Sequence, residues 1–282
     1  MSSENDNNNL SVNRCDYSHQ IKSNDNVIRT DLGKYSRITY ISNPSKGVRI
    51  KKLTKNEYID LESGELKQYN LNKSTSRSSV NRKLKKYEDI VLYNFTGGAS
   101  ELFITLTCRD NVTDISLIKE YYNNFLKNLK RDYKDVDYIA LFEQTELMCW
   151  HIHLFIKNNK HKRLYISHND LLRYWKQGAV YVMSNRNVFQ ALGHSKTKRN
   201  ERLERFTLFP KGERMYHKSK GIKIPVKEKM KFKDCPEYDS DKHKKVSSKT
   251  YQIKNISNDK VVNTIVNEMY KQSPTPNKLL ES

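Results

Sequence analysis

The spacing of hydrophobic residues divides the middle of the chain into helices and strands. Apolar residues at helical spacing predict helices over 74–95, 114–131, 169–177 and 187–205. Runs rich in β-branched and aromatic residues predict strands over 102–108, 136–143, 150–156 and 179–183. This order of elements predicts the α+β class, with one antiparallel sheet and helices packed on one face of it.

The two ends of the chain differ from the middle in composition. Residues 1–35 are rich in Asn, Ser and Asp and poor in apolar groups, which predicts a disordered N-terminal arm. We expect one domain over 36–235, with a small hairpin within 36–70. Residues 236–282 are predicted to form a helical and polar C-terminal extension.

The charge of the chain indicates a polyanionic partner. The 282 residues include 52 Lys+Arg against 32 Asp+Glu, a formal net charge of +20. Nucleic acid is the default partner for such a protein, and a membrane surface is the rival. The chain contains no apolar run long enough to span a membrane and no secretory pattern at its N-terminus, so we expect a cytoplasmic protein. Its four cysteines are scattered without a Cys-x-x-Cys pair, which favours a reducing compartment.

A strand with two histidines is the clearest chemical feature. His151 and His153 are two residues apart in an apolar run, so a strand places both imidazoles on one face. Glu143 precedes the turn that folds its strand back beside them. One carboxylate and two imidazoles predict a site for Mn²⁺ or Mg²⁺, and imidazole favours Mn²⁺ of the two. The alternative is a pair of half-exposed histidines near a solvated carboxylate.

A basic segment follows this strand. Between 196 and 233 there are fourteen Lys+Arg against four acidic residues. Such a segment predicts contacts to DNA phosphates with strongly salt-dependent affinity, whereas the alternative is a solvated charged face. The predicted DNA-binding residues are Lys196, Lys198, Arg199, Arg202, Arg205, Arg214, Lys218, Lys220 and Lys223.

Four segments in order carry a resemblance to a known family. They are the apolar strand Phe103–Thr107 ending in Thr-Leu-Thr, Glu143 with Trp150–Leu154, the Arg-Ser helix from Arg77, and the Tyr-x-x-Ser-Lys-Gly segment Tyr216–Pro225. Over about 36–225 the chain resembles the HUH (His-hydrophobe-His) replication initiators of rolling-circle plasmids and related phages.

The resemblance implies a palm-like, ferredoxin-like core and a specific reaction. It implies a metal-dependent single-strand DNA endonuclease and strand transferase of a mobile genetic element. In that reaction a tyrosine attacks a metal-bound phosphate, leaving a 5′-phosphotyrosine and a 3′-hydroxyl that primes synthesis. The implied partners are single-stranded or hairpin origin DNA and host replication proteins.

The chain departs from the family where the nucleophile is expected. Ala191 and Ser195 stand at the positions of the two helix tyrosines. Tyr181 and Tyr216 are the substitute candidates for catalysis, although among 18 tyrosines a packing role is the common outcome. Ser195 is a remote candidate, because the adjacent His194 points about 100° away on a helix.

Three readings of the departure stay open: a shifted register, a deliberate replacement, or a natural relative that does not cleave. The last of these gives the alternative function, a cleavage-deficient HUH-like DNA-binding protein that regulates or occludes an origin. A ribosomal or structural RNA-binding protein fits the charge but gives no reason for the Glu and His-x-His arrangement.

Overall fold

The computed structural model describes most of the chain and divides it into two compact units. The described residues are 10–17, 19–44, 50–54, 57–60, 64–68, 76–161, 163–184, 188, 192 and 199–273. The central unit is Lys73–Ile224, and the terminal unit combines Met1–Asn72 with Pro225–Ser282.

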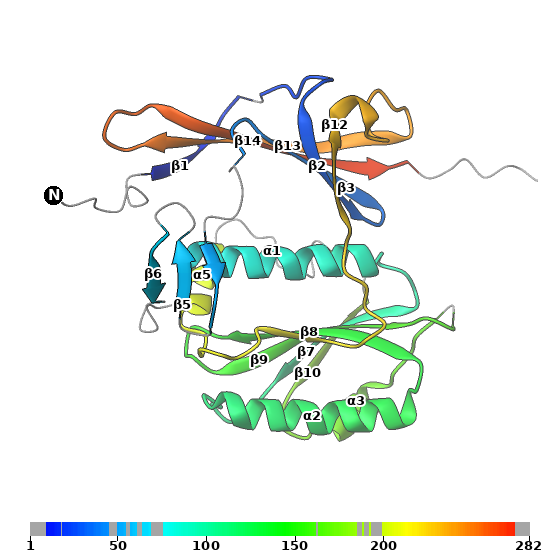
Figure 1. The fold of residues 1–282 in the computed structure, drawn as a ribbon. Coiled ribbons are helices and arrows are strands. Elements are labelled where there is room, and N and C mark those ends of the chain that lie inside the picture. Colours follow the sequence, from blue (N-terminus) through cyan, green and yellow to red (C-terminus); the bar gives the residue numbers. More distant parts are fainter. Residues whose placement is uncertain are drawn as a thin grey trace, which may run out of the picture. The chain divides into compact units, whose positions relative to one another are not determined.

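The central unit is built on a five-stranded antiparallel sheet in the order β10-β7-β9-β8-β11 (Figure 1). Its strands are β7 (Glu101–Thr107), β8 (Val136–Gln144), β9 (Trp150–Asn158), β10 (Val180–Ser184) and β11 (Tyr216–Lys218). The four strands predicted from hydrophobic runs are therefore confirmed, and β11 adds a fifth at the edge within the basic segment.

Four helices of the central unit lie in the described part of the chain. They are α1 (Arg77–Asn94), α2 (Ile115–Asp132), α3 (His168–Trp175) and α5 (Arg199–Thr207). The side chains of Ser76, Asp114 and Ser167 accept a hydrogen bond from a first-turn N–H and so cap α1, α2 and α3. Within the helix predicted over 187–205, the described residues are 188, 192 and the start of α5.

The α+β class is confirmed, but the helices cover both faces of the sheet rather than one. The ring of Tyr122 on α2 meets Phe142 edge-on at 5.1 Å, whereas Phe95 at the end of α1 meets Phe155 at 5.3 Å. Phe142 pairs with Ile152, which points away from the face of Phe155 because side chains alternate along β9. Figure 1 shows α1 on one side of the sheet and α2 with α3 on the other. The strands are apolar on both faces, so both faces need a cover.

The terminal unit contains a six-stranded antiparallel sheet in the order β1-β13-β14-β3-β2-β12 and a separate three-stranded sheet in the order β4-β5-β6. The large sheet has β1 (Leu10–Cys15), β2 (Asn26–Leu32), β3 (Tyr35–Ile41), β12 (Lys227–Lys231), β13 (His243–Asn255) and β14 (Val261–Gln272). The small sheet has β4 (Ile50–Lys52), β5 (Glu57–Asp60) and β6 (Leu66–Gln68).

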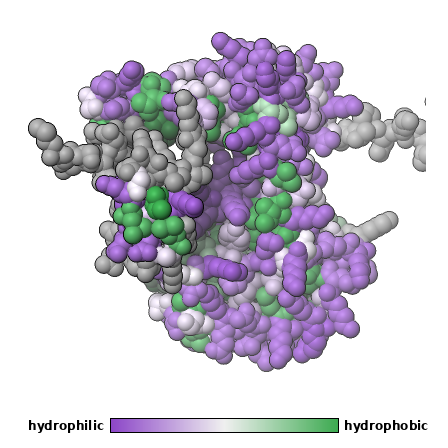
Figure 2. Space-filling model, viewed as in Figure 1, coloured by the Kyte–Doolittle hydropathy of each residue, from purple (hydrophilic) through white to green (hydrophobic). Residues whose placement is uncertain are grey.

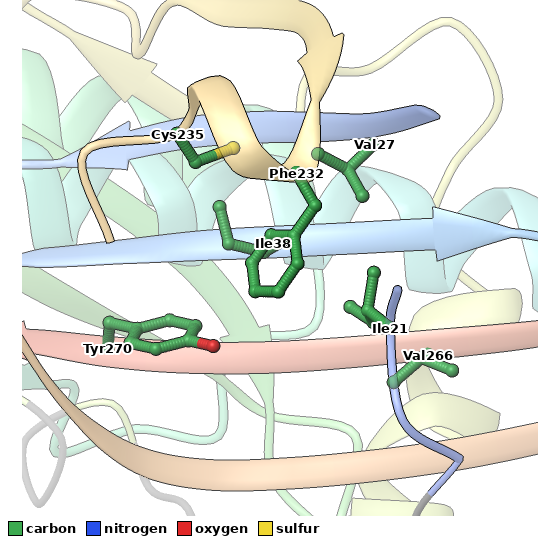
Figure 3. Close-up of a cluster of buried hydrophobic side chains, with 7 residues drawn as sticks. All are labelled: Ile21, Val27, Ile38, Phe232, Cys235, Val266 and Tyr270. Atoms are coloured by element: carbon green, nitrogen blue, oxygen red, sulfur yellow. The ribbon is translucent and has the colours of Figure 1, made fainter. Parts of the chain in front are cut away.

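One face of the six-stranded sheet carries the core of the terminal unit. The core residues come from strands, from the segment before β2 and from the short helix η2 (Phe232–Asp234) with the residue after it, as Figure 3 shows. They are Ile21, Val27, Ile38, Phe232, Cys235, Val266 and Tyr270. The two ends of the chain thus share one hydrophobic core.

This architecture corrects the predicted domain boundaries. The prediction of a disordered arm over 1–35 is wrong for β1 and β2, and the helical extension over 236–282 is wrong for β13 and β14. The single domain predicted over 36–235 is divided instead, and β3 pairs with β2 and β14 rather than within 36–70. The physical reason is that these strands bury one face against segments about 200 residues away, such as β1 on β13, which local periodicity does not reveal.

The visible surface fits a protein that works in water. The face in Figure 2 is mostly hydrophilic, with hydrophobic side chains in small groups. Among the helices that the structure describes, none is both long and apolar enough to cross a bilayer.

Gly178 generates a stability prediction. It lies against the end of β7, where Thr107 N–H donates to Ala179 O at 3.0 Å and Arg109 N–H donates to Gln177 O at 2.7 Å. A Cβ at position 178 would clash with Thr107 O and would lie 2.5 Å from Arg109 N. Because these are backbone atoms, we expect Gly178→Ala to lower the free energy of unfolding by about 2 kcal/mol or more.

Urea unfolding of the full chain measures this effect. Gly98→Ala is the matched control, because a Cβ there meets its nearest neighbour at an ordinary 3.6 Å. Equal midpoints for the two variants would contradict the prediction.

Candidate metal and DNA site

The pairing of three central strands assembles the predicted metal ligands. His151 on β9 lies opposite Glu143 on β8 and opposite Thr107 on β7. His153 lies opposite Thr105. Directly opposed residues share a face of the sheet, so these side chains all point to one side.

The ligand atoms are close enough for one ion. One nitrogen from His151, one from His153 and one carboxylate oxygen from Glu143 all lie within 4.8 Å of one another. The two Nε2 atoms are 2.9 Å apart, and His153 Nε2 is 3.6 Å from Glu143 Oε2. This donor set of two imidazoles and one carboxylate fits a divalent ion such as Mn²⁺ and leaves coordination positions for substrate oxygens.

A threonine orients one of the histidines. Thr105 Oγ1 lies 3.2 Å from His153 Nδ1. When Nδ1 carries the ring proton and donates to this hydroxyl, Nε2 keeps its lone pair for a metal. The Thr-Leu-Thr strand end therefore has a chemical role beside its packing role, which the sequence analysis did not assign.

Two arginines of α5 surround the carboxylate. Arg202 Nε donates to Glu143 Oε1 and Oε2 at 2.9 Å each, and its Nη2 donates to Oε2 at 2.6 Å. Arg205 Nη2 lies 3.6 Å from Oε1. Both arginines were predicted to contact DNA; in the structure they also hold the metal-site acid.

The surroundings suit the three groups to bind a cation. Burial lowers the pKa of His153 to about 3 and, against the opposing effect of Glu143, lowers the pKa of His151. Burial alone would raise the pKa of Glu143, but the charge of Arg202 outweighs it and the pKa falls below its usual value. At neutral pH the site therefore offers neutral imidazoles and an ionised carboxylate, the forms that ligate metals.

The structure places both substitute tyrosines on the face of the sheet that carries the histidines. Tyr181 on β10 lies opposite Thr105 and is 60% exposed. Tyr216 on β11 lies opposite Leu141, and its ring packs 5.6 Å from Tyr87 of α1. Burial raises the pKa of Tyr216. Each tyrosine is two strands from β9, or about 10 Å. Ala191 and Ser195 lie outside the described residues.

The remaining predicted DNA contacts separate into two groups. Arg214, Lys220 and Lys223 have exposed side chains, whereas Lys218 Nζ donates to Ile222 O at 2.7 Å and so supports its own loop. Lys196, Lys198 and the side chain of Arg199 lie outside the described part of the chain.

The Ser-Lys-Gly segment after β11 has a structural role. Ser219 Oγ donates to Asp137 Oδ1 at 2.7 Å and accepts from Tyr138 N–H at 3.0 Å. A Cβ on Gly221 would clash with the carboxylate of Asp137. The serine and glycine therefore fix the loop of β11 against β8.

Comparison with known proteins gives one match over this region. Residues 101–200 match the family described as replication-associated protein ORF2. The match includes the metal-site residues and Tyr181 but not Arg202, Arg205 or Tyr216. It supports a replication-initiator role. No curated protein matches the chain significantly.

Thr105 gives a test of the metal site. We expect Thr105→Val to weaken Mn²⁺ binding about tenfold, because His153 loses the partner that fixes its ring. Isothermal titration of the full chain with Mn²⁺ measures the affinity. Thr113→Val is the matched control, since Thr113 is exposed and only its carbonyl accepts from Trp150. Unchanged affinity in Thr105→Val would show that the hydroxyl does not orient the ligand.

Proposed function

We propose that this protein is a replication initiator that binds origin DNA and nicks and rejoins one strand to start rolling-circle replication. The observation that carries the proposal is the site of Glu143, His151 and His153, whose ligand atoms lie within 4.8 Å. The site lies within the residues that match the replication-associated family. The basic side chains of α5 and of the exposed loops beside the sheet support DNA as the substrate.

The reaction is metal-assisted transfer of a phosphoryl group to a tyrosine. A bound Mn²⁺ or Mg²⁺ would neutralise charge on the scissile phosphate. The tyrosine oxygen forms a bond to phosphorus, the bond from phosphorus to the 3′-oxygen breaks, and the proton lost by the tyrosine is balanced by one gained at the 3′-oxygen. The product is a 5′-phosphotyrosine, which the 3′-hydroxyl can attack to reseal the strand.

Among the two substitute tyrosines, Tyr181 is favoured as the nucleophile. It is exposed and lies on the histidine face of the sheet, opposite Thr105. Tyr216 shares that face but packs on Tyr87, and burial raises its pKa, so it forms the attacking phenolate less readily.

The second candidate is a cleavage-deficient DNA-binding protein that regulates or occludes an origin. The observation in its favour is the pair Ala191 and Ser195 at the positions where related initiators carry tyrosines. Such a protein would bind DNA through the same basic side chains without a covalent step.

A denaturing gel distinguishes the two functions. The full chain is incubated with single-stranded origin-like DNA and Mn²⁺, and any adduct is located by peptide mapping. For an initiator we expect a covalent adduct that EDTA abolishes and that Tyr181→Phe reduces by at least about a hundredfold. Tyr165→Phe is the matched control, because Tyr165 is 72% exposed in the same unit and should leave the adduct unchanged.

The other outcomes are equally informative. An adduct that persists in Tyr181→Phe and is lost in Tyr216→Phe would reassign the nucleophile. Binding without any adduct would reject the nicking function for the present chain. A gain of cleavage in Ala191→Tyr would then show a complete site that lacks only its nucleophile, whereas no gain would leave the regulatory function.

A further inference from the structure

The charges around the metal site are unbalanced. One carboxylate, Glu143, faces two guanidinium groups at 2.6 Å and 3.6 Å, and the two histidines add no negative charge in either protonation state. Both arginines are largely buried, with side chains 23% and 20% exposed. Solvent therefore screens their charges less than it would at the surface.

The two arginines are not equivalent. Arg202 uses its donors on both oxygens of Glu143 and on Leu192 O, at 3.2 Å. Arg205 makes only the longer ion pair with Glu143, and its buried Nε has no hydrogen-bond acceptor among the described residues. A buried donor without a partner is costly, and a phosphate oxygen is the acceptor that a guanidinium prefers.

We propose that a divalent ion and a DNA phosphate bind this site cooperatively, and that Arg205 couples them. This inference rests on the proposed function and specifies how the site selects its moment of loading. Without DNA, the two guanidinium groups repel a divalent cation from the carboxylate. A phosphate that accepts from Arg205 neutralises this charge and adds oxygen ligands for the ion.

The coupling has a functional consequence. An initiator that binds its ion weakly without DNA keeps its reactive site unloaded until a strand is in place. The energetic origin is Coulombic: removing one charge a few ångströms from a divalent ion changes its affinity by about tenfold or more in a partly screened site.

Isothermal titration of the full chain with Mn²⁺ tests the proposal, with and without a short single-stranded oligothymidylate. We expect DNA to tighten Mn²⁺ binding about tenfold, and Mn²⁺ to tighten DNA binding by the same factor because coupling is reciprocal. This second measurement needs only the wild-type chain, so it holds even if a variant fails to fold.

Variants of Arg205 identify the residue responsible. Arg205→Gln leaves the hydrogen bonds between Arg202 and Glu143 in place, so we expect it to bind Mn²⁺ more tightly without DNA and to lose most of the DNA effect. Arg205→Lys keeps the charge and should keep the effect. Arg173→Gln removes a charge of the same kind from α3, where Arg173 pairs with Asp170, and should behave as wild type.

The outcomes separate this inference from the proposed function. Equal Mn²⁺ affinity with and without DNA would overturn the coupling while leaving the metal site intact. A DNA effect that survives in Arg205→Gln would overturn the role of Arg205. An absence of Mn²⁺ binding under both conditions would reject the metal site itself and, with it, both proposals.

Discussion

The pairing of β9 with β7 on one side and β8 on the other is the constraint on which the site depends. It sets His151 between Thr107 and Glu143 and sets His153 beside Thr105. A slip of one residue would move the histidines to the face covered by α2 and separate them from the carboxylate. The apolar residues between the histidines prevent that slip, because they fill the opposite face, where Ile152 is fully buried.

The buried carboxylate links this register to the helices. An ionised Glu143 with a side chain only 7% exposed would be costly without a partner, and Arg202 offsets that cost through three short hydrogen bonds. Because Arg202 lies on α5, the same contact joins the helix to the sheet. Arg77 at the start of α1 pairs with Glu204 at 3.1 Å and joins α5 to a second helix. One acid therefore contributes to both the chemistry and the packing of this face.

The terminal unit obeys a different constraint, since its sheet requires strands from both ends of the chain. β14 pairs with β3, and β12 pairs with β2. Arg29 of β2 pairs at 2.9 Å with Glu237, whose side chain is fully buried, so charge as well as hydrophobic contact joins the two ends. The central unit is inserted between these segments in the sequence. The match to the replication-associated family covers part of the central unit and none of the terminal unit.

The sequence alone determined the elements of the central unit and its metal-site residues, because hydrophobic period and the spacing of His151 and His153 are local properties. Tertiary structure decided what depends on distant partners. The contact between Arg202 and Glu143 joins residues 59 positions apart, and the strands at the two chain ends are stable only when paired with each other. Thr105 followed the same rule, since its role arose only when β7 paired with β9. Local periodicity specifies which face of an element is apolar, but only the fold specifies what covers that face.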